Sequence, residues 1–423
     1  MDEIIEKNYE IAERRYAEYG IDTEDALKIL KNISISVHCW QGDDVGGFEK
    51  PDASLSGGGI QATGNYPGKA RNINELRQDL EMALSLVPGK HRVNLHSIYG
   101  DFGNDLIERN KIKVEDYQSW IDWAKRMDIK LDFNCSLFSH LKADDGFTLS
   151  SKSKEIREFW IEHVKLCREI SNEIGKQLND ACIHNIWIPD GSKDIPIDRI
   201  GHRMLLKNAL DDIFSQKYSQ TNVKDSLEGK LFGIGSEAFV VGSHEFYLSY
   251  VLKNDLMLTI DMGHYHPTES IGDKISSIIP FLNGILLHIS RGVRWDSDHV
   301  VILNDDLIQL TEEIIRSKAI DRIHYGLDYF DASINRIGAW VIGIRATQKS
   351  FLYALLQPLD LLQDYEENGK YFQRLAFLEE FKTMPFGAVW DYFCLKNKVP
   401  LGKNWIEKIE SYESNVLNLR QTL

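Results

Sequence analysis

Short runs of β-favouring apolar residues alternate with longer amphipathic segments along this chain, and this alternation constrains the fold more than any other feature. Strands that alternate with helices form a parallel sheet, and eight of them suggest closure into a barrel. The runs are almost wholly apolar, as expected for strands covered on both faces. The eight predicted strands are residues 33–38, 92–96, 130–134, 182–187, 226–231, 256–261, 284–289 and 322–328.

Helical sequence flanks the predicted barrel at both ends. Residues 2–19 and 23–31 carry apolar side chains at helical spacing, and Gly20 is suited to end the first helix. Further helices are predicted at 335–357, 359–367, 371–382, 386–396 and 404–419. We therefore expect an α/β fold, a (β/α)8 TIM barrel with N-terminal helices and a C-terminal α-helical extension. The expected domains are an N-terminal helical segment at 1–32, the barrel with its metal sites at 33–345, and the extension at 346–423.

The composition is typical of a water-soluble protein with a large core. Of the 423 residues 43% are hydrophobic, which is ample for a large core, and the 49 basic and 64 acidic residues leave a net charge of −15. That charge disfavours nucleic acids and anionic membranes as partners. Five widely spaced cysteines without a CxxC pair predict reduced thiols in the cytoplasm. The acidic N-terminus does not resemble a signal peptide, and no apolar stretch approaches the roughly 20 residues of a membrane span.

Side chains of the kind that bind metals follow the apolar runs. Carboxylates and imidazoles are ligands of divalent cations, and barrel enzymes carry their chemistry at the carboxyl ends of the strands. Asp261 and His264 are three residues apart and would share a face of a helical turn, although a solvated turn has the same pattern. Seven such ligands predict two ions rather than one. They are Glu228, Asp261, His264, His288, Asp296, Asp298 and Asp328.

The DxD pair and His288 each have an ordinary alternative. Asp296 and Asp298 would point the same way from an extended segment and could bind one cation, which relieves their repulsion, but a lone DxD is usually a solvated loop. His288 ends a very apolar run, where a histidine is often a core residue. Asp328 ends another run, and a buried carboxylate there needs a partner such as a metal ion.

Other polar and aromatic residues at the predicted strand ends could face a substrate. Glu228 and Lys230 would lie on one side of a strand, either as a salt bridge or as a ligand beside an ammonium that polarises a substrate oxygen. Trp40, Trp187 and Phe133 could form a wall that stacks on the apolar face of a sugar, although such aromatic residues also belong to protein cores, which is the assignment we favour for Phe133. His96 has no partner that the sequence makes visible. The Gly-rich residues 55–72 match neither a P-loop nor a GxGxxG fingerprint. They form a flexible loop or a lid over a polar substrate.

The order of these motifs, E-x-K, then acid-x-x-His, then D-x-D, resembles the xylose isomerase-like superfamily. Longer strings are similar to the bacterial L-rhamnose isomerase family, and the resemblance runs from the first helix to the last. It also covers the motifs around the predicted ligands, which makes it far more specific than any single motif. The strings are residues 38–45, 59–71, 185–191, 290–300 and 326–336.

The resemblance implies a homotetrameric aldose–ketose isomerase that interconverts L-rhamnose and L-rhamnulose in rhamnose catabolism. It implies two divalent ions, usually Mn²⁺, although Zn²⁺, Co²⁺ or Mg²⁺ also suit such ligands. The structural ion would be held by Glu228, Asp261, His288 and Asp328, and the catalytic ion by His264, Asp296 and Asp298. The positions on the substrate side are Lys230, Trp187, His96, Trp40 and Glu228.

The expected mechanism is a metal-assisted 1,2-hydride shift. Lys230 would support the charge that develops on oxygen, Asp328 would lie near the proton transfer, and His96 would assist ring opening or bind the sugar. An enediol route with a general base at C2 remains open. So do three other functions: another aldose isomerase, a non-catalytic carbohydrate-binding protein, and a metal-dependent phosphodiesterase or endonuclease, which the net charge disfavours.

Overall fold

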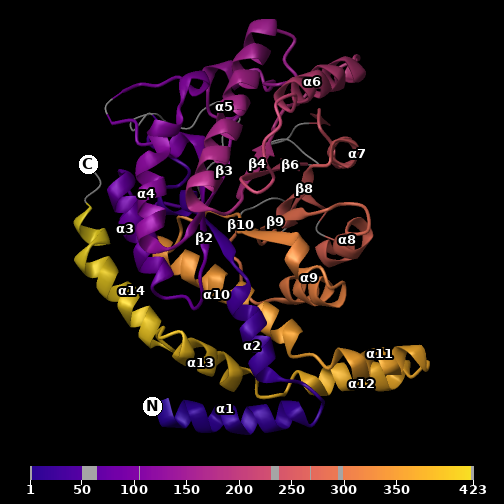
Figure 1. The fold of residues 1–423 in the computed structure, drawn as a ribbon. Helices are drawn as coiled ribbons and strands as arrows, with labels where there is room; N and C mark the ends of the chain where they lie inside the picture. Colours follow the sequence, from indigo (N-terminus) through magenta and orange to yellow (C-terminus); the bar gives the residue numbers. More distant parts are fainter. Residues whose placement is uncertain are drawn as a thin grey trace.

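Eight parallel strands close into a barrel in the computed structural model, which describes residues 2–49, 64–103, 105–229, 238–266, 268–293 and 299–420 (Figure 1). The strand order around the barrel is β1-β10-β9-β8-β6-β4-β3-β2, so the first and last strands pair with each other. The predicted (β/α)8 barrel is therefore confirmed. The strands are β1 (Ile35–His38), β2 (Arg92–His96), β3 (Lys130–Asn134), β4 (Cys182–Trp187), β6 (Val223–Glu228), β8 (Met257–Asp261), β9 (Ile285–Ile289) and β10 (Ile323–Leu327).

A helix follows each barrel strand, and polar caps fix where several of these helices begin. The side chain of Asn72 accepts hydrogen bonds from the backbone of Asn74 and Glu75, and Asn304 accepts one from Leu307. The two-residue strands β5 (Gly191–Ser192) and β7 (Phe239–Val240) pair outside the barrel. The helices are α3 (Ile73–Leu84), α4 (Gln118–Met127), α5 (Lys154–Leu178), α6 (Arg199–Ile213), α7 (His244–Asn254), α8 (Ile271–Ile278), α9 (Asp305–Arg316) and α10 (Arg336–Leu355).

The interior of the barrel contains hydrogen-bonded polar side chains where such barrels usually have layers of branched apolar ones. Asn134 donates to Asn94 Oδ1 over 2.7 Å between the neighbouring strands β3 and β2. Ser226 and Thr259, on β6 and β8, share a hydrogen bond of 2.6 Å. Most of the apolar core lies instead between the strands and the surrounding helices, where Trp120 and other large side chains are fully buried.

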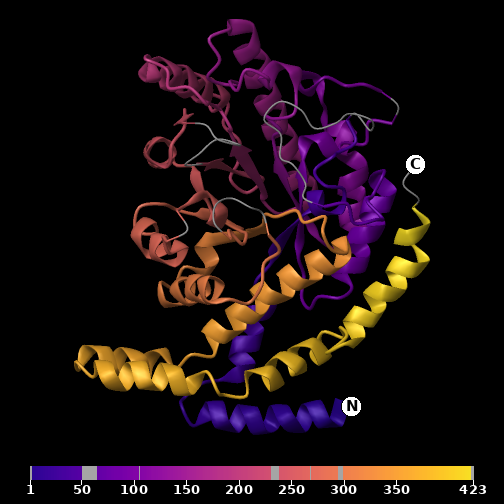
Figure 2. The ribbon, with the colours of Figure 1, turned by 180° about the vertical axis from the view of Figure 1, so that it is seen from behind.

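Helices at both ends of the chain lie together outside the barrel. Figures 1 and 2 show α13 (Phe386–Lys396) and α14 (Asn404–Asn415) as an arc along the outside, with α1 (Asp2–Ala17) beside α13. Tyr9 of α1 stacks on Tyr392 of α13 with ring centroids 3.7 Å apart. The hairpin of α11 (Leu359–Glu367) and α12 (Tyr371–Phe381) points away from the barrel, and α2 (Thr23–Asn32) leads into β1.

Several predicted boundaries differ from the structure. The strand expected at 226–231 is β6, which begins three residues earlier at Val223 and ends at Glu228. The boundary expected between 345 and 346 falls inside α10, which is continuous there; the division into three domains stays a prediction. Among the described residues, no helix has the combination of length and apolar character that crossing a bilayer requires.

Candidate metal centre

Four predicted metal ligands meet at the carboxyl end of the barrel. Glu228 and Asp261 are the last residues of β6 and β8, His288 lies near the end of β9, and Asp328 directly follows β10. The strands are parallel, so these positions lie at one end of the barrel. One potential ligand atom from each residue lies within 4.8 Å of the others. These four residues, here called the ligand cluster, come from four strands that are consecutive around the barrel.

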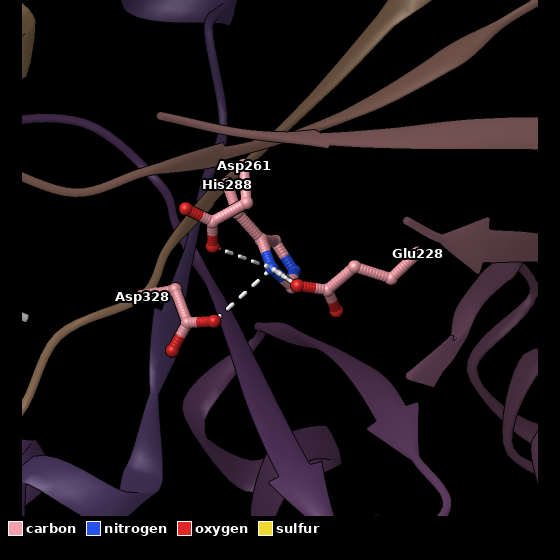
Figure 3. A group of neighbouring side chains, drawn as sticks. All are labelled: Glu228, Asp261, His288 and Asp328. Carbon is pink, nitrogen blue, oxygen red and sulfur yellow. Dashed lines mark ion pairs between the residues drawn. The ribbon is translucent and has the colours of Figure 1, made fainter. Parts of the chain in front are cut away.

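The three carboxylates of the ligand cluster face one imidazole (Figure 3). His288 Nδ1 lies 3.1 Å from an oxygen of Asp328, 3.6 Å from one of Asp261 and 3.7 Å from one of Glu228. Glu228, Asp261 and His288 are buried, while Asp328 is partly exposed. Carboxylate oxygens combined with an imidazole nitrogen suit a divalent cation such as Mn²⁺, Co²⁺ or Zn²⁺.

Glu228 is oriented by a chain of polar side chains in the barrel interior. Its Oε2 atom accepts a hydrogen bond of 2.7 Å from Asn185 of β4, while Oε1 faces His288. The amide oxygen of Asn185 accepts a bond of 2.8 Å from Thr259, which is bonded to Ser226. Such outer hydrogen bonds fix the direction of a metal ligand and adjust its affinity.

Asp261 and Asp328 are held in the same way, each through the oxygen that does not face His288. Asp261 Oδ1 accepts hydrogen bonds from the backbone of Gly263 at 2.6 Å and from Ser290 at 3.2 Å. Asp328 Oδ1 accepts one of 3.1 Å from the indole nitrogen of Trp40. Each carboxylate in the ligand cluster therefore directs its other oxygen toward the centre.

Electrostatic interactions within the ligand cluster favour a bound cation. Burial raises the pKa of Asp328, and the negative charges of Asp261 and Glu228 raise it further. Burial acts to lower the pKa of His288, but the neighbouring carboxylates, Glu228 first, raise it well above 6.5. Burial would likewise raise the pKa of Glu228, yet the nearby histidines lower it to about 2. A divalent ion bound by all four side chains would replace the proton of His288 and neutralise the three carboxylates.

His264 lies next to the ligand cluster, at the end of the short 3-10 helix η6 (Met262–His264). Its Nδ1 atom is 3.3 Å from Glu228 Oε1, and its Nε2 atom is 4.0 Å from Asp261 Oδ2. Its predicted partners in a second metal site, Asp296 and Asp298, lie outside the described residues. Lys230 does too, and the second site therefore stays a prediction.

The predicted substrate-side aromatics lie along one arc at the same end of the barrel. Trp40, in the 3-10 helix η1 (Cys39–Gly42), packs edge-on against His96 at 4.8 Å between ring centroids. The ring centroid of Phe138 lies 5.4 Å from that of His96 and 5.8 Å from that of Trp187, so Phe138 contacts both of these predicted residues. Burial lowers the pKa of His96 to about 3, so its ring is neutral. Whether the arc binds sugar stays a prediction at this point.

The sequence interpretation missed Asn185 and Phe138. Asn185 lies two residues before Trp187 on β4, and alternate residues of a strand point to the same side, so its inward direction could have been inferred. Its bond to Glu228 depends on the pairing of β4 with β6, which spacing alone does not give. Phe138 lies beyond the end of β3, so the alternation of residues along a strand gives no direction for its side chain.

The molecule is a (β/α)8 barrel in which three carboxylates and an imidazole converge at the carboxyl end of the strands. This arrangement is typical of barrel enzymes with a divalent-metal centre. The model of the family "L-rhamnose isomerase (RhaA)" matches residues 3–420. The chain belongs to the L-rhamnose isomerase family, and it is an isomerase.

Individual relatives agree with the family match over nearly the whole chain. The L-rhamnose isomerase of Bacteroides thetaiotaomicron is 54% identical over 419 residues, covering 99% of both chains. That of Enterobacter sp. (strain 638) is 52% identical over 98% of this chain and 99% of its own. That of Rhodopirellula baltica is 50% identical over 98% and 97%. A solved L-ribulose 3-epimerase is more distant, with 11% identity and a TM-score of 0.49 over 78% of this chain and 98% of its own.

Proposed function

We propose that this isomerase interconverts the aldose L-rhamnose and the ketose L-rhamnulose, in rhamnose catabolism. The observation that carries the proposal is the near-complete coverage by relatives of 50–54% identity that are named L-rhamnose isomerase. The ligand cluster supports it, because a divalent ion held there would supply positive charge to the oxygens of a sugar.

Two divalent ions are part of the proposal, with manganese as the ion in the cell. Glu228, Asp261, His288 and Asp328 would hold one ion. His264, Asp296 and Asp298 would hold the other. When bound, the ions supply the positive charge that binds the sugar oxygens at C1 and C2 and polarises the carbonyl.

The reaction proposed is a 1,2-hydride shift. The hydrogen on C2 moves to C1 with its electron pair, and the proton of the O2 hydroxyl is transferred to O1, so that an aldehyde and an alcohol become an alcohol and a ketone. Lys230 stabilises the negative charge that develops on oxygen. Asp328, whose Oδ1 accepts a hydrogen bond from Trp40, would assist the proton transfer between the two oxygens.

The remaining proposed contacts hold the sugar. Trp40 and Trp187 present aromatic faces to the apolar side of the sugar, and Glu228 contributes a carboxylate oxygen to its hydroxyls. His96, whose ring contacts Trp40 and Phe138, would assist ring opening or bind the sugar.

The activity can be tested with the purified protein. We expect ketose formation from L-rhamnose that disappears after EDTA treatment and returns with Mn²⁺. If the protein holds metal by elemental analysis but does not convert L-rhamnose, the proposed substrate is wrong, and other aldoses should be assayed next.

An isotope label separates the two routes for hydrogen transfer. With deuterium at C2 of L-rhamnose, the hydride shift requires that the label is retained at C1 of the ketose. Loss of the label to solvent would instead support the enediol route, in which a general base removes the C2 proton.

We also propose that the protein is a cytoplasmic homotetramer. The hairpin of α11 and α12 points away from the barrel in Figures 1 and 2. Three apolar residues of α12, Tyr371, Phe372 and Leu375, are exposed by 61%, 79% and 62%. Exposed apolar side chains that lie together are typical of subunit interfaces. Light scattering coupled to size-exclusion chromatography should give four times the chain mass of 48.6 kDa, and a monomer would contradict this proposal.

A further inference from the structure

A buried hydrogen-bond network holds His96 from the side of Nδ1. His96 Nδ1 lies 3.2 Å from the hydroxyl oxygen of Ser136, and that oxygen lies 2.9 Å from the hydroxyl oxygen of Ser97. His163 of α5 touches both serines and the backbone of Arg109. All five residues are buried, where nearly every polar group has a hydrogen-bond partner. This restricts where the protons can be.

The protons of His163 can be assigned from its partners. The backbone N–H of Ser136 donates to Nε2 of His163 over 3.1 Å, so Nε2 carries a lone pair and no proton. The opposite nitrogen, Nδ1, lies 2.9 Å from the carbonyl oxygen of Arg109, which can only accept. His163 therefore carries its proton on Nδ1. Burial lowers the pKa of His163 to about 3, in agreement with a neutral ring.

The direction of the serine hydroxyls follows from this assignment. A neutral imidazole has one lone pair, and Ser136 already uses that of His163. Ser97, whose oxygen is 3.5 Å from the same nitrogen, therefore donates its proton to Ser136 Oγ at 2.9 Å. The hydroxyl of Ser136 accepts this bond and keeps its own proton for Nδ1 of His96.

We propose that Ser136 is a positioning residue that fixes His96 with its proton on Nε2, so that His96 offers an N–H donor to the substrate and no lone pair. His96 then binds an oxygen that accepts a hydrogen bond, such as the ring oxygen or carbonyl oxygen of a sugar. It does not remove a proton from the substrate. The identity of the acceptor rests on the proposed function, whereas the proton position does not.

A buried ion pair keeps Ser136 in place. The guanidinium of Arg109 donates to the carbonyl oxygens of Ser136 and Phe138, each over 2.6 Å, and its Nε lies 2.8 Å from a carboxylate oxygen of Glu49. Phe138 packs in turn against His96. The same guanidinium thus fixes the backbone of the serine that bonds to His96 and of an aromatic ring that packs against it.

Neutron diffraction from crystals of the metal-loaded, deuterium-exchanged protein tests the proton position directly. We expect deuterium on Nε2 of His96, on Nδ1 of His163 and on Ser136 Oγ in the direction of His96. The backbone carbonyl of Cys135 also interacts with the His96 ring. Deuterium on Nδ1 of His96, donated to that oxygen or to Ser136, would overturn the proposal. No sugar is needed, so the result stands even if L-rhamnose is not the substrate.

Kinetics of three serine variants test the consequence for turnover. Ser136→Ala removes the hydroxyl and should lower kcat/KM about tenfold, the effect of one buried hydrogen bond, at unchanged metal content. Ser136→Thr keeps a hydroxyl and should recover most of the activity. Ser139→Ala is the matched control, because the Ser139 hydroxyl is buried without a hydrogen-bond partner among the described residues. Equal activity of Ser136→Ala and the wild-type protein would contradict the positioning role, whichever aldose is the substrate.

Discussion

Asn185 shows how one side chain outside the ligand cluster can control metal binding. Its amide donates to Glu228 over 2.7 Å and is itself held by Thr259. We expect Asn185→Ala to weaken binding of Mn²⁺ about 10–100-fold, as for other outer hydrogen bonds of metal ligands. Metal titration of the stripped protein measures this. Asn283→Ala is the control, because Asn283 also donates to a carboxylate, Asp255, but at an exposed position; an equal loss in both variants would contradict the prediction.

His163 gives a pH dependence of stability whose sign is fixed. Burial lowers its pKa in the folded protein to about 3 from the ordinary value of 6.5. Below pH 6.5 the unfolded chain therefore takes up a proton that the folded chain does not. The contribution of His163 to the free energy of unfolding should be complete above pH 6.5. As the pH decreases toward 3, this contribution should fall by up to about 1.4 kcal/mol per pH unit.

Thermal unfolding at pH 7 and pH 5 checks this prediction. His38 and His91 have lowered pKa values from burial as well, so the wild-type protein should lose more stability than one histidine explains. His163→Gln should show a smaller loss between the two pH values than the wild-type protein. The same loss in both proteins would show that His163 is protonated in the folded chain.

Most of the described site residues were predictable because they lie at or near the end of an apolar run. Asp261, His288 and Asp328 were found in this way, because a charged or imidazole side chain after buried strand residues stands out. Ser136 and Phe138 lie beyond the end of β3 and act through contacts with residues far along the chain. Their roles depend on which strands become neighbours, and spacing within one segment does not contain that information.

At the scale of elements, Gly175 illustrates a helix position where tertiary contact outweighs helix propensity. It lies in α5, and a Cβ atom there would be 1.8 Å from the carbonyl oxygen of Asn222. That oxygen is fixed by a hydrogen bond from the backbone of Cys182 at the start of β4. Replacement of glycine by alanine in a helix normally stabilises it by about 1 kcal/mol, but here it must displace backbone.

We expect Gly175→Ala to lower the free energy of unfolding by about 1–3 kcal/mol, the usual effect of overpacking. Gly387→Ala in α13 is the matched control, because a Cβ atom there meets nothing within 4 Å. It should leave the stability unchanged or raise it slightly. Denaturation of both variants beside the wild-type protein gives the comparison, and a stable Gly175→Ala variant would show that α5 can move away from Asn222.

The elements themselves were largely predictable, because the barrel strands are short apolar runs and the helices have caps and amphipathic faces. α11 and α13 coincide with the predicted segments 359–367 and 386–396. The start of β6 was missed because Lys224 and Asp225 interrupt its apolar character. Both are explained by tertiary contacts: Asp225 pairs with the buried Arg168, and Lys224 lies 3.4 Å from His324.

At the scale of the whole molecule, the ligand cluster joins β6, β8, β9 and β10, which are consecutive around the barrel. A bound ion would therefore stabilise half of the barrel wall, and its removal would leave three carboxylates close together. We expect EDTA to lower the Tm and excess Mn²⁺ to restore it, since an ion that binds only the folded state adds its binding free energy to stability. Glu228→Gln should abolish most of this shift, and an unchanged Tm in the wild-type protein would contradict metal binding at the cluster.

The pairing of β1 with β10 has a consequence for the order of events during synthesis. The hydrogen bond from Trp40 to Asp328 joins residues 288 positions apart, and the barrel closes only when its last strand has been made. Domains emerge from the ribosome with the N-terminal part first. For most of translation the nascent chain thus lacks a complete set of ligands. The ligand cluster can bind an ion through all four side chains only after about three-quarters of the chain, up to Asp328, has been made.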